Sequence, residues 1–145
     1  MASSQSEAEW EGNLKEGRGT FRTQQGALFG DYSFLSRFEN GTGSNPEELL
    51  GAAHAGCFSM ALAHALSEAG YHPQRIRTKA KVHLNAVAKG FAITRIDLYV
   101  EGEVPDIDDH QFAQMAEETK VNCPVSKAIH PDVQVKLEAK LKAKV

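Results

Sequence analysis

Cysteine is scarce in this chain of 145 residues, which contains only Cys57 and Cys123. Neither belongs to a Cys-x-x-Cys pair, so the sequence does not support a zinc ribbon or a thioredoxin-type dithiol motif. An excess of charge of one sign is also lacking, because the formal net charge is −3 and the sequence pI is about 6.1. The composition therefore gives no electrostatic reason to bind nucleic acid or anionic lipid.

Targeting and membrane signals are missing as well. Residues 1–10 lack the basic start and the apolar stretch of a secretory signal, and no later run is expected to span a bilayer. We therefore expect a cytoplasmic protein that has neither nucleic acid nor a membrane as a partner. In that reducing compartment a permanent disulfide is disfavoured, whereas a transient catalytic one is allowed. Any bond between the two cysteines should be reversible.

The residues that are present suit one globular domain over residues 1–145, since 41% of them are hydrophobic and 24% are charged. Turn residues divide residues 8–34 into short strands, which predicts a small β-meander. Asn45, Pro46 and two following acids predict the start of a helix, and Gly70 predicts its end near residue 69. This helix carries apolar side chains almost all round, so we expect other elements to cover more than one of its faces.

The second half of the chain alternates between strand and helix patterns. Strands are predicted at residues 76–86 and 91–104, a helix at 108–120, a short helix at 124–129 and a final strand at 133–141. Cys123 precedes Pro124, where the free amides of a helix start would stabilise a thiolate. Cys57 lies within the long helix among alanines, where a cysteine is by default a small buried hydrophobe. The residues alone leave two interpretations open, inert buried thiols or a reactive pair.

Two long motifs resemble those of a known family. Residues 44–62, which include Ala-His-Ala-Gly-Cys-Phe-Ser-Met-Ala-Leu, and residues 122–127, Asn-Cys-Pro-Val-Ser-Lys, closely resemble the OsmC/Ohr family of thiol-dependent hydroperoxide reductases. Shorter matches at residues 10–12, 36–39 and 90–94 look like the OsmC branch, so the similarity covers nearly the whole chain. The resemblance implies an α+β fold in which a long central helix packs against antiparallel sheets, in an intertwined homodimer.

The same resemblance implies roles for four residues. Cys57 would be the peroxidatic cysteine, which peroxide oxidises to a sulfenic acid, and Cys123 would resolve it by closing a disulfide. Arg37 and Glu47 match the family's activating pair. A guanidinium suits this role because an unperturbed thiol is only a few per cent ionised near neutral pH, and a bidentate carboxylate would hold the guanidinium in place. Arg18, near where the Ohr branch places its arginine, is the alternative to Arg37.

The spacing of Glu47 and Cys57 raises a geometric question. Ten residues of one helix separate them by about 15 Å along its axis, which one side chain cannot bridge. Either the helix bends, or the Arg37 and Glu47 that serve one Cys57 come from the partner chain. We expect the partner chain.

Apolar residues near the motifs predict the class of substrate. Phe34, Phe38, Leu50, Phe58 and Met60 are expected to line the entrance to the thiol, which would favour organic hydroperoxides over hydrogen peroxide. The reaction needs no metal, flavin or haem cofactor. An external dithiol must reopen the disulfide, and the family resemblance suggests a dihydrolipoyl protein as this reductant.

Other interpretations of these residues have less support. His54 and His64 share a side of the helix with Cys57, but further metal ligands are few there, so we expect His54 to pack or hydrogen-bond near the thiol. A non-catalytic redox-sensing or ligand-binding stress protein could use the same cysteine pair, although the sequence has no DNA-reading element. A serine hydrolase is excluded by spacing, since Ser126 and Lys127 form no Ser-x-x-Lys motif.

Overall fold

The computed structural model describes residues 2–142. The chain divides into two compact units, one that ends at Leu49 and one that begins at Leu50. Helices and strands both contribute to the structure, which confirms the α+β class. The single domain over residues 1–145 stays a prediction.

The N-terminal unit contains a three-stranded antiparallel meander, which confirms the prediction for residues 8–34. Its strands β1 (Ser6–Glu11), β2 (Arg18–Thr23) and β3 (Phe29–Tyr32) pair in the order β1-β2-β3. Gly19 lies opposite both Trp10 and Tyr32, whose ring centroids are 5.5 Å apart. A Cβ atom at Gly19 would lie 2.5 Å from the Tyr32 ring, so only glycine allows the two rings to pack across β2.

A short helix, α1 (Phe34–Phe38), follows the meander and was missed by the sequence analysis, which extended a strand toward Phe34. The Ser36 N–H donates to Ser33 Oγ at 3.1 Å, and the Ser33 N–H donates to Ser36 Oγ at 2.8 Å. This reciprocal cap starts a helix, but it uses serine where the usual signal has glutamate or glutamine. The local sequence therefore carried only a weak form of the signal.

The long helix α2 (Pro46–Glu68) begins and ends where the sequence predicts. The Glu48 N–H donates to Asn45 Oδ1 at 2.8 Å, and the Asn45 side-chain amide donates to the Ser36 carbonyl at 3.0 Å. Asn45 therefore caps α2 and ties its first turn to α1. At the other end, Gly70 adopts a φ of 92°, the left-handed conformation that terminates helices at low cost in glycine.

The C-terminal unit is built on a second sheet, with strands β4 (Arg75–Val87), β5 (Gly90–Glu103) and β6 (Gln134–Leu141) in the order β4-β5-β6. The β4 and β5 pairing is antiparallel, whereas β5 and β6 are parallel. The expectation of purely antiparallel sheets is therefore wrong for β6. The reason is the crossover through α3 (Asp109–Asn122) and α4 (Pro124–Ala128), because a helical connection returns the chain to run parallel to β5.

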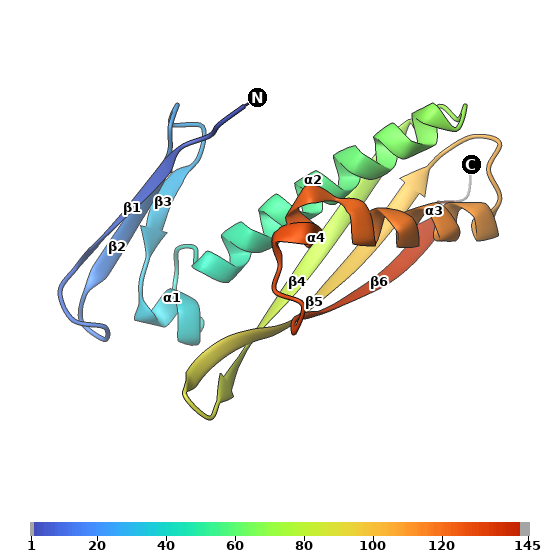
Figure 1. Cartoon of the computed structure of the whole chain (residues 1–145). Helices are drawn as coiled ribbons and strands as arrows, with labels where there is room; N and C mark the ends of the chain where they lie inside the picture. The colour runs from blue at the N-terminus through green and yellow to red at the C-terminus, as the bar shows by residue number, and fades with distance from the viewer. Residues whose placement is uncertain (1, 143–145) are drawn as a thin grey trace. The chain divides into compact units, whose positions relative to one another are not determined.

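Helices cover one face of this sheet (Figure 1). The core is formed by side chains that alternate along β5 and by one face each of α2 and α3: Ile96, Leu98, Val100, Phe58, Leu62, Leu66, Phe112, Met115 and Ala116. Gly102 allows α3 to approach β5, since a Cβ atom there would lie 2.6 Å from the Phe112 ring. The predicted alternation along the second strand and the predicted apolar face of α3 are both confirmed.

One charged residue of β5, Asp97, is buried between the side chains of His83 and Arg95. His83 Nε2 lies 2.8 Å from Asp97 Oδ2, and Arg95 Nε lies 3.0 Å from Asp97 Oδ1. The His83 hydrogen bond, partly opposed by burial, and the Arg95 interactions hold the pKa of Asp97 below its usual value. The carboxylate is thereby kept ionised within the sheet.

Within the C-terminal unit, the described residues cover α2 on one side only. By length and composition alone it could cross a membrane, contrary to the expectation that no run qualifies. Phe58, Leu62 and Leu66 are instead completely buried in the core on the sheet. The remaining surface exposes small and apolar residues, namely Ala52, Ala53, Gly56 and Met60. The C-terminal unit by itself therefore does not supply the second cover that the apolar composition of α2 predicts.

Candidate functional site

The two cysteines meet between α2 and α4. Both are free thiols, and their side chains are close enough for each to shift the pKa of the other. Cys123 is buried at the junction where α3 ends and α4 begins, with Pro124 in the first turn of α4. Cys57 is half-buried on α2. The structure thus brings together two thiols that are far apart in the sequence, one of them reachable from solvent.

The first amides of α4 contact both sulfur atoms. Burial raises the pKa of the Cys57 thiol, the Val125 N–H partly offsets this, and the contact with Cys123 adds to the increase. Burial acts in the same direction on Cys123, but hydrogen bonds from the Ser126 hydroxyl and N–H, together with those from Cys57 and the Val125 N–H, outweigh it and hold the pKa of Cys123 below its usual value. Only one of two thiols in contact ionises readily, because two adjacent thiolates repel.

A buried histidine continues this cluster. Ser126 Oγ lies 3.3 Å from Cys123 Sγ, and the Ser126 N–H donates to the same sulfur at 3.4 Å. On its other side Ser126 Oγ lies 2.8 Å from His54 Nε2. His54 is completely buried, and burial lowers its pKa, which keeps the imidazole neutral. The histidine therefore does hydrogen-bond near a thiol, but it reaches Cys123 through Ser126. The sequence analysis considered Ser126 only as a hydrolase nucleophile.

His64, the other histidine of α2, is exposed. Within residues 2–142, no group of three or more His, Cys, Asp or Glu side chains is arranged to hold a metal ion.

Arg37 and Glu47 form an ion pair within the N-terminal unit. Arg37 Nε and the terminal nitrogen Nη2 both donate to Glu47 Oε1, at 3.0 and 2.7 Å. The pair therefore converges on one carboxylate oxygen, which corrects the two-oxygen arrangement expected from the sequence. The Glu47 side chain is 8% exposed, and the guanidinium carbon of Arg37 lies 5.4 Å from the centroid of the Phe38 ring. Arg37 is thus held from two sides, while part of its guanidinium stays open to solvent.

The alternative arginine has a different environment. Arg18 is the first residue of β2 and is exposed. In the part of the chain that the structure describes, no ion pair involves it. A fixed orientation therefore distinguishes Arg37 from Arg18.

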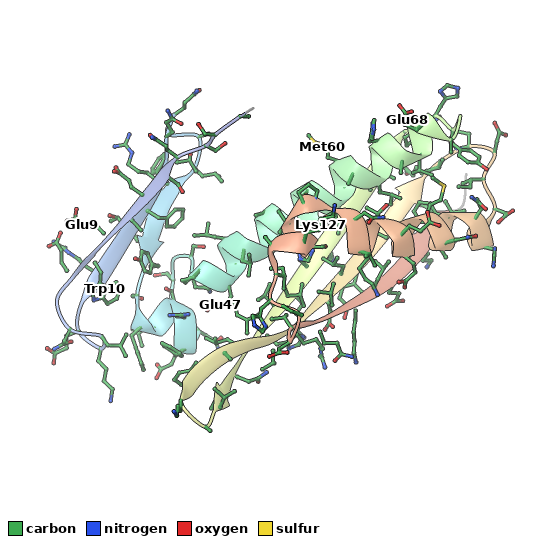
Figure 2. All side chains as sticks on the ribbon, viewed as in Figure 1. Glu9, Trp10, Glu47, Met60, Glu68 and Lys127 are labelled. Carbon is green, nitrogen blue, oxygen red and sulfur yellow. The ribbon has the colours of Figure 1, made fainter. Side chains whose placement is uncertain are left out.

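The five predicted pocket residues are divided between the two units. Phe34 and Phe38 stack within α1, with ring centroids 5.0 Å apart. Met60 projects from α2 and is 76% exposed (Figure 2). Leu50 is partly buried against the core. Phe58 has no exposed surface, because its position on α2 faces the sheet. Its assignment to a pocket entrance is therefore corrected to a core position.

An α+β fold that holds two free thiols in contact, with hydrogen-bond donors aimed at one of them, defines a cysteine-based redox protein. Residues 39–138 match the family model described as OsmC-like protein. The chain is also 47% identical over 135 residues to Peroxiredoxin OsmC of Escherichia coli (strain K12), an alignment that covers 92% of this chain and 94% of that protein. The chain belongs to the OsmC family.

The Ohr branch is also similar to this chain. The Organic hydroperoxide resistance protein OhrB of Bacillus subtilis (strain 168) is 31% identical over 103 residues, which cover 70% of this chain and 74% of that protein. The crystal structure of OhrB of Bacillus subtilis superposes with a TM-score of 0.75 at 28% identity, covering 94% of this chain and 98% of that chain. Sequence and fold therefore place this chain with the same two groups of proteins.

Proposed function

We propose that this protein is a thiol-dependent peroxidase that reduces organic hydroperoxides to alcohols. The observation that carries the proposal is the contact between the free thiols of Cys57 and Cys123. The Cys57 thiolate attacks a peroxide oxygen, the O–O bond breaks, and the alcohol leaves while Cys57 becomes a sulfenic acid. Cys123 then attacks the Cys57 sulfur and expels water as the disulfide closes. An external dithiol, such as that of a dihydrolipoyl protein, reduces the disulfide in the reducing cytoplasm.

Exposure supports this order of the two cysteines. Cys123 is only 1% exposed, whereas Cys57 is half-buried and accessible from outside. A hydroperoxide can therefore reach Cys57 first. Disulfide closure needs no approach from solvent, since the two sulfurs are already in contact.

Cys57 needs a cation to act at neutral pH, because burial raises the pKa of its thiol. Arg37 is the candidate, since Glu47 and Phe38 fix its guanidinium. The same guanidinium can hydrogen-bond the peroxide and stabilise the departing alkoxide. We assign the Arg37 and Glu47 that serve one Cys57 to the partner subunit of a homodimer. The uncovered surface of α2, formed by Ala52, Ala53, Gly56 and Met60, supports this assembly.

The activity is tested by following alcohol formation from tert-butyl hydroperoxide with dihydrolipoamide as reductant. The parental protein should turn over many times, whereas Cys57→Ser should be inactive. Cys123→Ser should oxidise and then accumulate a sulfenic acid or overoxidised Cys57, visible by intact mass. A protein that consumes one equivalent of peroxide and stops is a redox sensor, and that result would overturn the proposal.

The contribution of the partner subunit is tested by mixing two inactive variants. Arg37→Ala and Cys57→Ser subunits are unfolded together and refolded, which gives heterodimers as about half of the molecules. If Arg37 acts across the dimer, each heterodimer has one intact site, so the mixture should regain about a quarter of the parental activity. If Arg37 acts within its own chain, every site carries a defect and the mixture should stay inactive.

A further inference from the structure

A chain of contacts runs from His54 through Ser126 to Cys123, and the proposed reaction gives no role to His54 or Ser126. His54 and Cys57 come from α2, while Cys123 and Ser126 come from the start of α4. The distances are 2.8 Å between His54 Nε2 and Ser126 Oγ, and 3.3 Å between Ser126 Oγ and Cys123 Sγ. Both are hydrogen-bond distances for their atoms. The cluster therefore links a neutral imidazole to the resolving sulfur through one hydroxyl group.

The environment of His54 determines which of its nitrogens carries the proton. His54 Nδ1 is buried and has no hydrogen-bond partner among the described residues. Buried N–H groups without an acceptor are rarer in proteins than buried acceptors without a donor. The proton therefore resides on Nε2, and the Nε2–H donates to Ser126 Oγ.

This assignment fixes the direction of the Ser126 hydroxyl. Because Ser126 Oγ accepts from His54, its own proton is free to donate to Cys123 Sγ. The Ser126 N–H is a second donor to the same sulfur, at 3.4 Å. Two donors to one sulfur favour its negatively charged form over the neutral thiol.

We propose that His54 is a positioning residue, which orients the Ser126 hydroxyl so that it donates to the Cys123 sulfur and stabilises the thiolate that closes the disulfide. The inference rests on the proposed function for its place in the cycle, and it goes beyond that function by assigning His54 and Ser126 to one step. Ser126 touches a reacting atom, whereas His54 acts only through Ser126.

The arrangement takes effect in the second half of the cycle. While Cys57 is a thiolate, its charge opposes ionisation of Cys123. Oxidation to the sulfenic acid removes that charge, so Cys123 can release its proton to solvent. The Cys123 thiolate then attacks the Cys57 sulfur, the S–O bond breaks, and the departing hydroxide takes up a proton to form water. The sum is one thiol and one sulfenic acid converted to one disulfide and one water.

Apart from Cys57, no other titratable side chain of the described elements around Cys123 is in a position to replace Ser126 as the donor to its sulfur. From α2, Cys57 contacts the sulfur directly and His54 contacts it through Ser126. On α3, Lys120 pairs with Glu117 at 3.0 Å, and on α4, Lys127 is exposed. The side chains of β5 and β6 that belong to this core cluster are apolar.

The first test is an equilibrium titration of Cys123 without peroxide. A Cys57→Ala background removes the coupled thiol, and ultraviolet absorbance follows thiolate formation against pH. Adding Ser126→Ala should move the midpoint upward by about one pH unit or more, the effect of losing a hydrogen bond to a charged group. Adding His54→Leu instead should also raise the midpoint of Cys123, but by less. Ser126→Thr keeps a hydroxyl group, so it should have the same midpoint as the Cys57→Ala background.

Ser59→Ala is the matched control for the loss of a partly buried serine hydroxyl. Ser59 lies on the same helix as His54, and its Oγ atom is hydrogen-bonded to Thr78 Oγ1 at 2.7 Å. This control should leave the Cys123 midpoint unchanged. Equal midpoints with and without Ser126→Ala, or an equal shift in Ser59→Ala, would overturn the inference. If Ser126→Ala does not fold, the midpoints of folded His54→Leu and Ser126→Thr proteins still decide the question.

The second test separates this inference from the proposed function. One equivalent of tert-butyl hydroperoxide is mixed with protein that has both cysteines, and sulfenic acid and disulfide are quantified by intact mass over time. Ser126→Ala should form sulfenic acid at no less than the parental rate. The pH at which its rate of disulfide closure is half-maximal should be raised by the same amount as the Cys123 midpoint in the titration. If the parental protein forms no sulfenic acid, the proposed function fails while the titration still decides the role of Ser126. If closure shows the parental midpoint, the inference fails and the peroxidase stands.

Discussion

Replacing Arg37 with alanine should slow the attack of Cys57 on a hydroperoxide by about 3 × 10³-fold or more. A thiol with an ordinary pKa of about 8.5 is about 3% ionised at pH 7. Because burial raises the pKa of Cys57, its ionised fraction without a cation is smaller than this. If Arg37 ionises the thiol almost fully, its removal lowers the thiolate population about 30-fold or more.

The guanidinium has a second effect that is independent of ionisation. It donates hydrogen bonds to the oxygen that becomes an alkoxide, and the loss of one such donor typically reduces rates by about 10² to 10³-fold. Glu47 Oε1 accepts from Nε and from Nη2 at 3.0 and 2.7 Å, which leaves one N–H on Nη2 and both on Nη1 as donors for the peroxide. Multiplying a loss of about 30-fold by a loss of about 10² to 10³-fold gives a combined decrease of about 3 × 10³ to 3 × 10⁴-fold in the rate.

The assay uses a Cys123→Ser background, in which the reaction stops at the sulfenic acid. The rate constant with tert-butyl hydroperoxide is measured from about pH 5 to about pH 9. The parental rate should level off at a lower pH than that of Arg37→Ala, which should keep rising toward alkaline pH. Arg18→Ala is the matched control from the same unit and should behave like the parent. A parental rate in Arg37→Ala would refute the reasoning, and a loss confined to Arg18→Ala would transfer the role to Arg18.

Three further predictions follow from the structure. The Phe38 ring lies beside Arg37 and its centroid is 5.0 Å from that of the Phe34 ring, so tert-butyl hydroperoxide should react faster than hydrogen peroxide in the same assay, and the reverse preference would contradict an apolar approach to the site. Because the pKa of Asp97 is lowered, its contribution to stability is present above the unfolded-state value of about 3.9 and is lost as the pH falls through the folded-state value. Asp97→Asn should therefore be less stable than the parent near neutral pH in urea unfolding, and the difference should narrow in acid; a constant difference would contradict the ion-pair account. Gly102→Ala should lower the free energy of unfolding by about 1 to 3 kcal/mol, since its Cβ atom would lie 2.6 Å from the Phe112 ring, and unchanged stability would show that the ring moves aside freely.

Local signals in the sequence predicted much of the secondary structure. The start of α2 was predictable because the Asn45 side chain caps the first free amides of the helix, an interaction confined to four residues. The alternation along β5 was predictable because one side of that strand faces the core. The helix α1 was missed because Ser36 replaces the glutamate or glutamine of the usual reciprocal cap.

The motifs around the cysteines also carried the family and the candidate residues, but not their geometry. Sequence reasoning placed His54 near a thiol from its spacing to Cys57, yet its partner Ser126 belongs to another helix. The pairing of Arg37 with Glu47 was expected, whereas its convergence on Oε1 was not. Phe58 was misassigned because helical spacing alone does not tell which face of an apolar helix meets a sheet.

Residue patterns alone predicted where the long helix begins and ends and which residues could supply a nucleophile, and the family resemblance indicated Arg37 and Glu47 as a pair while Arg18 stayed an alternative. These features depend on residues that are close in the sequence or on sequence motifs that can be recognised without a structure. The three-dimensional fold was needed to learn that the Cys57 and Cys123 thiols lie beside each other, that Ser126 directs two donors to one of them, and that β6 runs parallel to β5. Such contacts depend on how the crossover through α3 and α4 returns the chain to the sheet, and no local propensity encodes that path.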